Sequence, residues 1–264
     1  MIKLVVTDVD GTLVKEGTLE LNPEYYDVIR ALTAKGIRVV MASGRQYESI
    51  RKLMEPVQDL VWFIADGGAT LKTDRGFEAV GEIPREWVEL AWKDISNIPG
   101  MDGALGVPDR CYVPFADSEM TKRLRDDYQF HVSYLNGWDN LPKVPICKIS
   151  LYRHAEIERY ADKYFIPRWE GKLHMSIAGE WWLDCLMPGI NKGTALAKIL
   201  ERTGIEASQV MATGDNPNDL EMIRLAGTGL AVATAHDKVK EAADGIIPSY
   251  AEDGVLKEWK KLLL

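Results

Sequence analysis

The sequence has few cysteines and no surplus of positive charge. Its three cysteines, Cys111, Cys147 and Cys185, are odd in number and far apart, which excludes a disulfide framework and the paired spacing of a zinc site. Lysine and arginine total 32 against 40 aspartates and glutamates, giving a formal net charge of -8 and a pI near 5.2. Neither nucleic acid nor an anionic membrane is therefore expected as the main partner.

Long apolar runs are also missing. No stretch reaches membrane-spanning length, and Met1 leads into a strand-like segment without the basic and hydrophobic regions of a signal peptide. Together with the scattered cysteines, this predicts a soluble protein of the reducing cytoplasm. The chain has 264 residues, 46% of them hydrophobic, which is enough for a full core in one large domain or two.

Short apolar runs and amphipathic segments alternate near both ends of the chain. The runs are rich in β-branched residues, as buried strands are, and Asn22-Pro23 has the chemistry of a helix start. This alternation predicts an α/β fold with a Rossmann-like parallel sheet covered by helices. The expected strands are residues 2–8, 37–43, 61–65, 209–215 and 228–233, and the expected helices include 22–35, 47–54 and 192–203.

The middle of the chain has a different texture. Between residues 84 and 187, strand-like pieces such as 146–153 alternate with amphipathic segments, and six of the eight tryptophans fall here. Gly and Pro mark both borders of this segment. We therefore expect a core built from residues 1–83 and 188–264, with an α+β module inserted at 84–187.

Two carboxylates follow the first expected strand. Asp8 and Asp10 are one residue apart, so on an extended chain they point the same way and repel each other. An Asp-x-Asp after a strand is often only a solvated turn. Gly11-Thr12 favours a functional interpretation, because a tight glycine turn can aim backbone N–H groups at an anion.

Three further polar groups stand where open α/β sheets place their ligand sites, at or near the carboxyl ends of strands. Ser43-Gly44-Arg45 could be a helix cap and its loop, and Asp219 could simply suit a helix N-terminus. Lys192 is harder to explain structurally, since a cation at a helix N-terminus opposes the macrodipole. The candidate residues are Ser43, Gly44, Lys192, Asp215, Asn218 and Asp219.

Taken together, these groups indicate phosphoryl transfer. Asp8 is the candidate nucleophile that forms an aspartyl phosphate, and Asp10 is the candidate acid and base. Mg²⁺ prefers oxygen ligands, which Asp8 and Asp215 could supply. The residues expected to hold the phosphate oxygens are Ser43 with its neighbour Gly44, Lys192 and Asn218.

Four ordered motifs carry a resemblance to a known family. DVDGTLV, SGR, the lysine of NKGTAL, and GDNPND resemble the haloacid dehalogenase superfamily of phosphatases, and the long insertion resembles the type-two cap of its Cof-type subfamily. The resemblance implies that Asp8 is the nucleophile, Asp10 the acid/base and a backbone Mg²⁺ ligand, Asp215 a metal ligand and Asp219 its support. Two positions depart from the family pattern: Thr7, where an apolar residue is usual, and Gly67, where Asn is usual.

We therefore expect a Mg²⁺-dependent phosphatase that hydrolyses a small phosphorylated metabolite, a sugar phosphate in the first instance, with specificity set by the cap. Two alternatives stay open. A phosphomutase of the same superfamily begins with the same aspartyl phosphate. A phospho-aspartate signalling or sensor module also combines an acidic pocket with Ser and Lys, although it would not need the inserted module.

Overall fold

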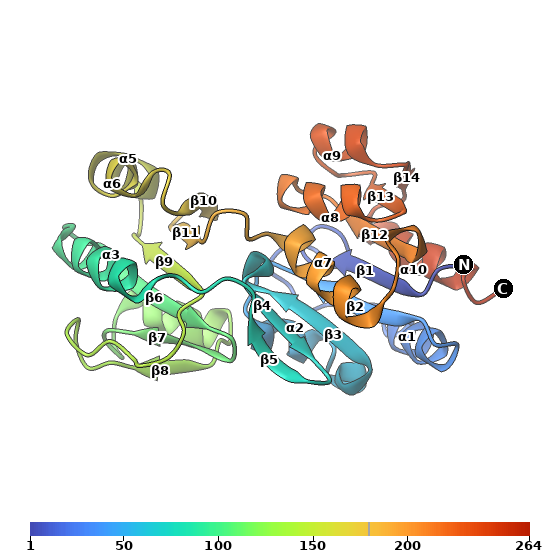
Figure 1. The fold of residues 1–264 in the computed structure, drawn as a ribbon, viewed down its shortest axis with the longest axis horizontal. Helices are drawn as coiled ribbons and strands as arrows, with labels where there is room; N and C mark the ends of the chain where they lie inside the picture. Colours follow the sequence, from blue (N-terminus) through green and yellow to red (C-terminus); the bar gives the residue numbers. More distant parts are fainter. Residues whose placement is uncertain (179) are drawn as a thin grey trace. The chain divides into compact units, whose positions relative to one another are not determined.

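The computed structural model describes residues 1–178 and 180–264 (Figure 1). The chain divides into two compact units, one formed by residues 1–76 and 191–264 and the other by residues 77–190. The second unit is longer at both ends than the segment 84–187 expected from the Gly and Pro punctuation. The backbone N–H of Ile83 donates to the carbonyl of Ile146 at 2.8 Å, which ties the segment before α3 (Arg85–Asn97) into the second unit.

An eight-stranded sheet forms the centre of the first unit, and its last strand, β5, starts at Gly76, where this part of the unit ends. From β14 to β3 the neighbouring strands pair in parallel, and β4 pairs antiparallel with β3. This confirms the predicted α/β core, and it brings the carboxyl ends of β1, β2 and β12 to one edge of the sheet. In spatial order the strands are β14 (Gly245–Ile247), β13 (Thr228–Val232), β12 (Val210–Gly214), β1 (Leu4–Asp8), β2 (Arg38–Ala42), β3 (Val61–Ala65), β4 (Thr70–Thr73) and β5 (Gly76–Ala79).

Helices connect the parallel strands. The helix after β1 is assigned from Glu24, but Pro23 before it already has helical angles. Asn22 Oδ1 accepts the Glu24 N–H at 3.0 Å, so the helix starts where Asn22-Pro23 indicated. The segment after β12 opens with a single tight turn, Pro217–Asp219, before α8 begins. The helices of this unit are α1 (Glu24–Ala34), α2 (Tyr47–Leu53), α7 (Lys192–Thr203), α8 (Leu220–Leu225), α9 (Asp237–Ala242) and α10 (Gly254–Lys261).

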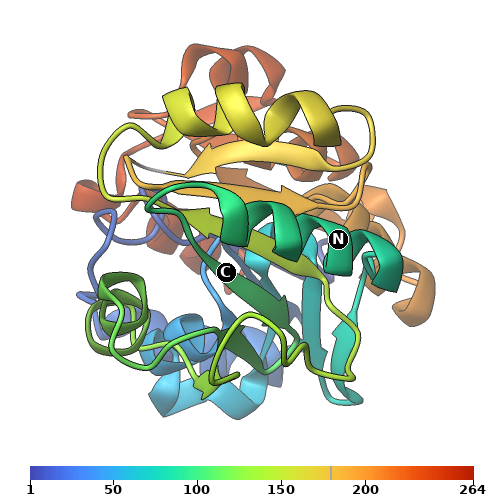
Figure 2. The same ribbon diagram turned by 90° about the vertical axis from the view of Figure 1, so that its left-hand side faces the viewer.

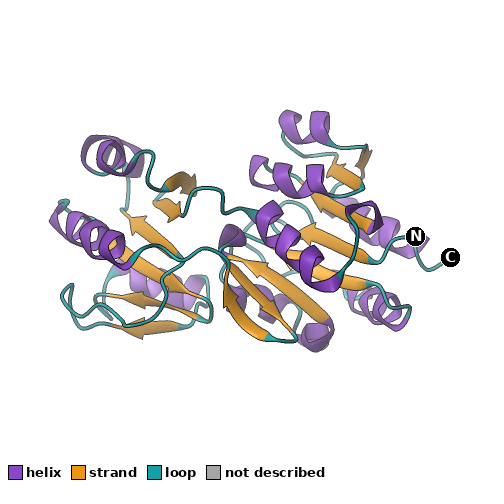
Figure 3. Cartoon of the chain, viewed as in Figure 1, coloured by secondary structure: helices purple, strands orange, loops and turns teal. Residues whose placement is uncertain are grey.

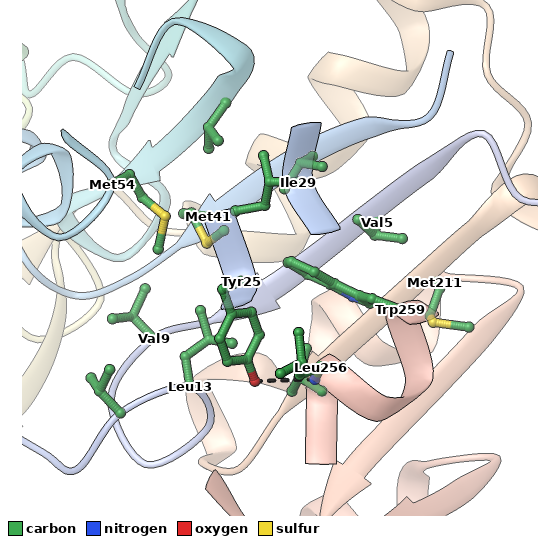
Figure 4. Packing of buried hydrophobic residues seen from close by; sticks show 14 of the residues in the cluster. Val5, Val9, Leu13, Tyr25, Ile29, Met41, Met54, Met211, Leu256 and Trp259 are labelled. Atoms are coloured by element: carbon green, nitrogen blue, oxygen red, sulfur yellow. Dashed lines mark hydrogen bonds between the residues drawn. The ribbon is translucent and has the colours of Figure 1, made fainter. Parts of the chain in front are cut away.

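One apolar cluster joins the first and last helices to the sheet (Figure 4). The rings of Tyr25 and Trp259 meet edge to face with centroids 5.9 Å apart, a geometry that contributes about 0.5–1.5 kcal/mol beyond area burial. Leu256 N–H donates to the Tyr25 hydroxyl at 3.1 Å, so the hydroxyl satisfies a backbone donor in the first turn of α10. Helices α1 and α10 are thereby packed against each other in the same cluster as the strands of the sheet.

In the described residues of the second unit, a six-stranded sheet is accompanied by four α-helices, which confirms the predicted α+β composition. Two of its strands, β6 and β8, were not expected; β6 reads DGALGV, and glycine and aspartate are poor strand formers. The strands in spatial order are β10 (His174–Ala178), β11 (Trp182–Leu186), β9 (Lys148–Tyr152), β6 (Asp102–Val107), β7 (Arg110–Val113) and β8 (Val132–Tyr134). The helices are α3 (Arg85–Asn97), α4 (Glu119–Lys122), α5 (Ile157–Tyr164) and α6 (Ile166–Trp169).

The two faces of this second sheet differ. Helices α3, α5 and α6 pack on one face, where residues such as Trp92, Ile149 and Trp169 form the core of the unit (Figures 2 and 3). On the opposite face, α4 covers an apolar patch around Trp182, and the polar residues Ser150 and Asp184 alternate with the core positions of β9 and β11. Among the described residues, no helix combines the length and the apolar character that crossing a membrane would require.

Candidate active site

The turn after β1 brings Asp8 and Asp10 to the carboxyl edge of the first sheet. Asp8 is the last residue of β1 and is buried, with 4% of its surface exposed. Gly11 follows with φ of 81° and lies so close to the Asp215 carboxylate that a Cβ there would collide with it. Glycine is therefore required at this position for the left-handed turn and for the close approach of two segments.

Lys192 is the centre of the charge arrangement. It is the first residue of α7, and its buried ammonium donates to Asp8 Oδ1 at 2.5 Å and to Asp219 Oδ1 at 2.7 Å. Burial by itself would lower the pKa of this lysine, but attraction to Asp219 and Asp8 outweighs it and raises the pKa above its ordinary value. The lysine is therefore charged at any physiological pH, and the side chain of Asn191 caps the helix beside it.

Asp215 and Asp219 come from the turn after β12. Asp219 Oδ2 accepts the backbone N–H groups of Asp215 and Asn216, both at 3.0 Å, while its Oδ1 accepts from Lys192. Asp215 Oδ1 accepts the Thr12 hydroxyl at 2.9 Å. Both oxygens of Asp219 are therefore engaged by the protein, so this residue orients the turn, whereas Asp215 has an oxygen left for a ligand.

Three carboxylates thus face one ammonium. The ligand oxygens of Asp8, Asp215 and Asp219 lie within 4.8 Å of one another. Burial, together with repulsion from Asp219 and Asp215, raises the pKa of Asp8 well above its usual range against the pull of Lys192. Burial and repulsion from Asp219 likewise raise the pKa of Asp215. With all three ionised, the group carries a surplus of negative charge that a cation would neutralise.

The residues present fit a divalent metal ion. Asp8 Oδ2 is buried and has no hydrogen-bond partner among the described residues, and an orphaned buried oxygen of this kind is costly unless a ligand reaches it. The donor set is entirely oxygen, which suits a hard cation. Asp8 and Asp215 are the side chains that would hold the ion.

Ser43 and Arg45 follow β2 at the same edge. Ser43 is fully buried, and its Oγ accepts the Arg45 N–H at 3.0 Å. The Arg45 guanidinium forms a bidentate, fork-like pair with the Asp10 carboxylate, in which Nε donates to Oδ2 at 2.8 Å and Nη2 donates to Oδ1 at 2.5 Å. Sequence reasoning gave Arg45 no role; only its place beside Ser43 in the SGR motif pointed to it. Gly44, between them, is exposed.

Two other expected positions lie nearby in the first unit. Asn218 is exposed on the Pro217–Asp219 turn, so its predicted contact with phosphate stays a prediction. Gly67 has φ of 68°, and its N–H donates to the Ser43 carbonyl at 3.0 Å. Its neighbour Gly68 is pressed against the Asn191 carbonyl with no room for a Cβ. This loop therefore links the Ser43 segment to the start of α7.

Comparisons with known proteins identify the family of the chain. Residues 5–258 match the family described as haloacid dehalogenase-like hydrolase, which confirms the resemblance carried by the four motifs. A solved structure from Eubacterium rectale is 34% identical, covers 99% of both chains and superposes with a TM-score of 0.91.

Two curated relatives cover nearly the whole chain. The 5-amino-6-(5-phospho-D-ribitylamino)uracil phosphatase YbjI of Escherichia coli is 25% identical over 99% of this chain and 96% of its own length. The phosphoglycolate phosphatase of Methanoculleus marisnigri is 27% identical over 99% of this chain and 97% of its own length. This chain therefore belongs to the haloacid dehalogenase-like hydrolase family, as a phosphatase of that family.

Proposed function

We propose that the protein is a Mg²⁺-dependent phosphatase that hydrolyses a small phosphorylated metabolite, a sugar or polyol phosphate, through an aspartyl phosphate on Asp8. The observation that carries the proposal is the pairing of a buried, unpartnered Asp8 Oδ2 with a charged Lys192 at 2.5 Å from Oδ1 of the same carboxylate. A carboxylate with one oxygen fixed and the other free is oriented for attack on phosphorus.

The proposed reaction has two halves, formation of the aspartyl phosphate and its hydrolysis, and Asp8 and Asp10 take part in both. Asp8 attacks phosphorus, the bond from phosphorus to the ester oxygen breaks, and Asp10 gives its proton to the departing oxygen. A water molecule then attacks the phosphorus of the aspartyl phosphate and loses its proton to Asp10, and inorganic phosphate leaves with the Asp8 carboxylate restored. Ser43, Gly44, Lys192 and Asn218 are proposed to hold the phosphate oxygens during both halves.

Mg²⁺ is the proposed ion because phosphoryl transfer favours a small octahedral cation that keeps some of its water. It would be held by the carboxylates of Asp8 and Asp215 and the backbone carbonyl of Asp10, with Asp219 as support for the site. When bound, it offsets the charge that develops on the phosphoryl oxygens. The protein's own part is to keep Asp8 oriented by Lys192 and the Asp215 turn oriented by Asp219.

The second unit is proposed as the cap that recognises the leaving group, with residues 84–187 as its essential part. Every candidate catalytic residue lies in the first unit. The second unit offers a polar group on its sheet, where the Ser150 hydroxyl donates to Asp184 at 2.6 Å and Lys148 Nζ lies 3.4 Å from the same carboxylate. Such a group, with hydrogen-bonding capacity on a rigid sheet, suits a hydroxylated substrate.

The proposed substrate class, small phosphate monoesters, is supported by the chemistry of the site and by the substrates for which two relatives are named. One relative is named for a phosphorylated ribityl compound and another for phosphoglycolate, both small phosphate monoesters. All three cysteines are buried thiols, and a cytoplasmic location is proposed on that basis.

The test is release of inorganic phosphate from a panel of sugar phosphates, polyol phosphates and phosphoglycolate. We expect continued release over many turnovers with Mg²⁺, loss of activity in excess chelator and weak support by Ca²⁺, whose larger shell relaxes the geometry. A single turnover would indicate a phospho-aspartate module instead, and formation of a phosphate isomer without phosphate release would indicate a mutase. Full activity in chelator would contradict the metal assignment.

A further inference from the structure

A cavity of about 280 Å³ lies at the other edge of the first sheet. Lys3 and Arg38 line it at the amino ends of β1 and β2, whereas Asp8 and Ser43 stand at the carboxyl ends of the same strands. Five residues of strand separate the two edges, roughly 16 Å at 3.3 Å per residue. The cavity is therefore separate from the catalytic carboxylates.

The cavity concentrates positive charge in an acidic protein. Four of its lining residues are basic, and a single acid, the exposed Asp74, stands with them, although the whole chain has a net charge of -8. The basic residues come from four different segments: Lys3, Arg38, Arg75 and Arg202. Like charges brought together by the fold repel one another unless an anion joins them.

The sheet register brings the backbone of Arg38, at the start of β2, next to the backbone of Lys3. Arg38 pairs with Leu4 in the parallel ladder, and its N–H donates to the Lys3 carbonyl at 2.8 Å. The Arg38 guanidinium then lies over the Trp62 ring, 3.7 Å from its centroid. Stacking fixes the plane of the guanidinium and leaves the N–H groups at its rim for an acceptor.

Neither an acid nor a helix dipole accounts for this cluster. Across residues 1–178 and 180–264, the side chains of Lys3, Arg38 and Arg75 form no ion pair. The C-terminus of α7 would favour a cation in its last turn, and this explains Arg202. It does not explain the other three, which belong to the starts of two strands and to the turn after β4.

We propose that this cavity is a binding site for a small phosphate-bearing anion, distinct from the catalytic site. Its volume stands at the lower end of the range for ligand pockets, which limits the ligand to a phosphate or a small phosphorylated molecule. The cations match a dianion, the hydroxyl-bearing residues Thr73 and Thr203 line the same cavity, and Ile199 and Ile205 offer an apolar wall to any organic part. Free inorganic phosphate and a phosphorylated metabolite share this chemistry.

Indole NMR on the full chain gives a signal from this cavity alone. The Trp62 indole N–H resonance is assigned by comparing wild type with Trp62→Phe, and inorganic phosphate or butylphosphonate is titrated at constant ionic strength against chloride. We expect a saturating shift of the Trp62 signal with the phosphorus anions and none with chloride. Tighter binding of butylphosphonate assigns the site to a metabolite, and equal or weaker binding assigns it to free phosphate.

Two substitutions and a matched control decide the outcome. Arg75→Gln should raise the dissociation constant read at Trp62 about two- to fivefold, as expected for an exposed charge. Arg38→Gln should raise it about tenfold, as expected for a bond to a charged group. Lys257→Gln, at an exposed lysine of α10, should leave it unchanged. Because Arg75 makes no stacking contact with Trp62 among the described residues, its effect does not depend on the indole environment. No shift, an equal shift with chloride, or equal affinity in all three variants would overturn the proposal.

Discussion

The Lys192 ammonium lies 2.5 Å from Oδ1 of Asp8, although 184 residues separate the two along the chain. The same ammonium also holds Asp219 at 2.7 Å. One cation therefore joins the first strand, the start of α7 and the turn after β12. Because Lys192 occupies one oxygen of Asp8, the direction of the other oxygen is fixed before any substrate arrives.

The nucleophile is the first point to test. Asp8→Asn should lower kcat by at least about 10⁴-fold, the order of loss seen when a nucleophile is removed, because an amide does not form the acyl phosphate. Phosphate release measured at saturating substrate checks this. Asp237→Asn, an exposed carboxylate on α9, serves as the matched control and should retain wild-type activity. Near wild-type turnover in Asp8→Asn would exclude the covalent route.

Stability in excess chelator should depend on pH through Asp215. Its pKa is raised by burial and by Asp219, so between its ordinary value of 3.8 and the raised value the folded state binds more protons than the unfolded chain. Stability from this group therefore falls as pH rises through that window. Asn does not titrate, so the stability of Asp215→Asn relative to wild type should increase from about pH 4 upward.

The urea unfolding midpoints of wild type and Asp215→Asn, measured in chelator from about pH 4 upward, test whether the relative stability of the variant rises with pH. Asp237→Asn again supplies the control, since its side chain is 92% exposed. Added Mg²⁺ should stabilise wild type more than Asp215→Asn at neutral pH, because only wild type binds the ion well. A relative stability of Asp215→Asn that falls with rising pH would contradict the crowding of the three carboxylates.

Arg45 should act as a positioning residue for Asp10. Its fork engages both oxygens of that carboxylate, and its Nη2 also donates to the Thr18 carbonyl at 2.9 Å. Arg45→Lys keeps the charge but cannot form two parallel bonds. We expect kcat to fall while KM stays nearly unchanged. Asp10→Asn would remove the whole contribution of general acid–base catalysis, roughly 10²–10⁴-fold, and the fall in kcat of Arg45→Lys should be smaller than that.

Steady-state kinetics on one phosphate monoester would separate the two effects. Arg30→Lys, in an exposed pair with Asp27, is the control. A rise in KM at constant kcat would instead assign Arg45 to substrate binding.

Asp184 should influence which leaving group is accepted. Asp184→Asn keeps the shape of the side chain but changes its bonding to Ser150 and Lys148. We expect the ranking of phosphorylated metabolites by kcat/KM to change. Hydrolysis of p-nitrophenyl phosphate should hold within about twofold, because its apolar leaving group makes little use of such a polar group. Glu170→Gln, an exposed substitution in the same unit, should alter neither. An unchanged ranking of substrates would show that Asp184 and its partners Ser150 and Lys148 do not determine specificity.

Much of the first unit could be predicted from local patterns. The segments 37–43 and 61–65 are continuous apolar runs, and the structure places β2 and β3 inside them; a parallel sheet buried on both faces requires such runs. Lys192 to Thr203 was expected as a helix and forms α7. Asp8, Ser43 and Asp215 stand at or directly after strand ends, so the parallel topology alone brings them to one edge.

Short-range periodicity and ordered motifs are properties of the chain alone, so the fold class, the strand-end positions of the acidic residues and the family could be predicted from them. The interaction partners of the side chains could not, because they depend on the folded arrangement. The fork from Arg45 to Asp10, the sharing of Lys192 between two carboxylates and the stacking of Arg38 on Trp62 depend on strand register and on close approach of segments far apart in the chain. No local pattern encodes such distances, since they follow from the packing of the whole unit.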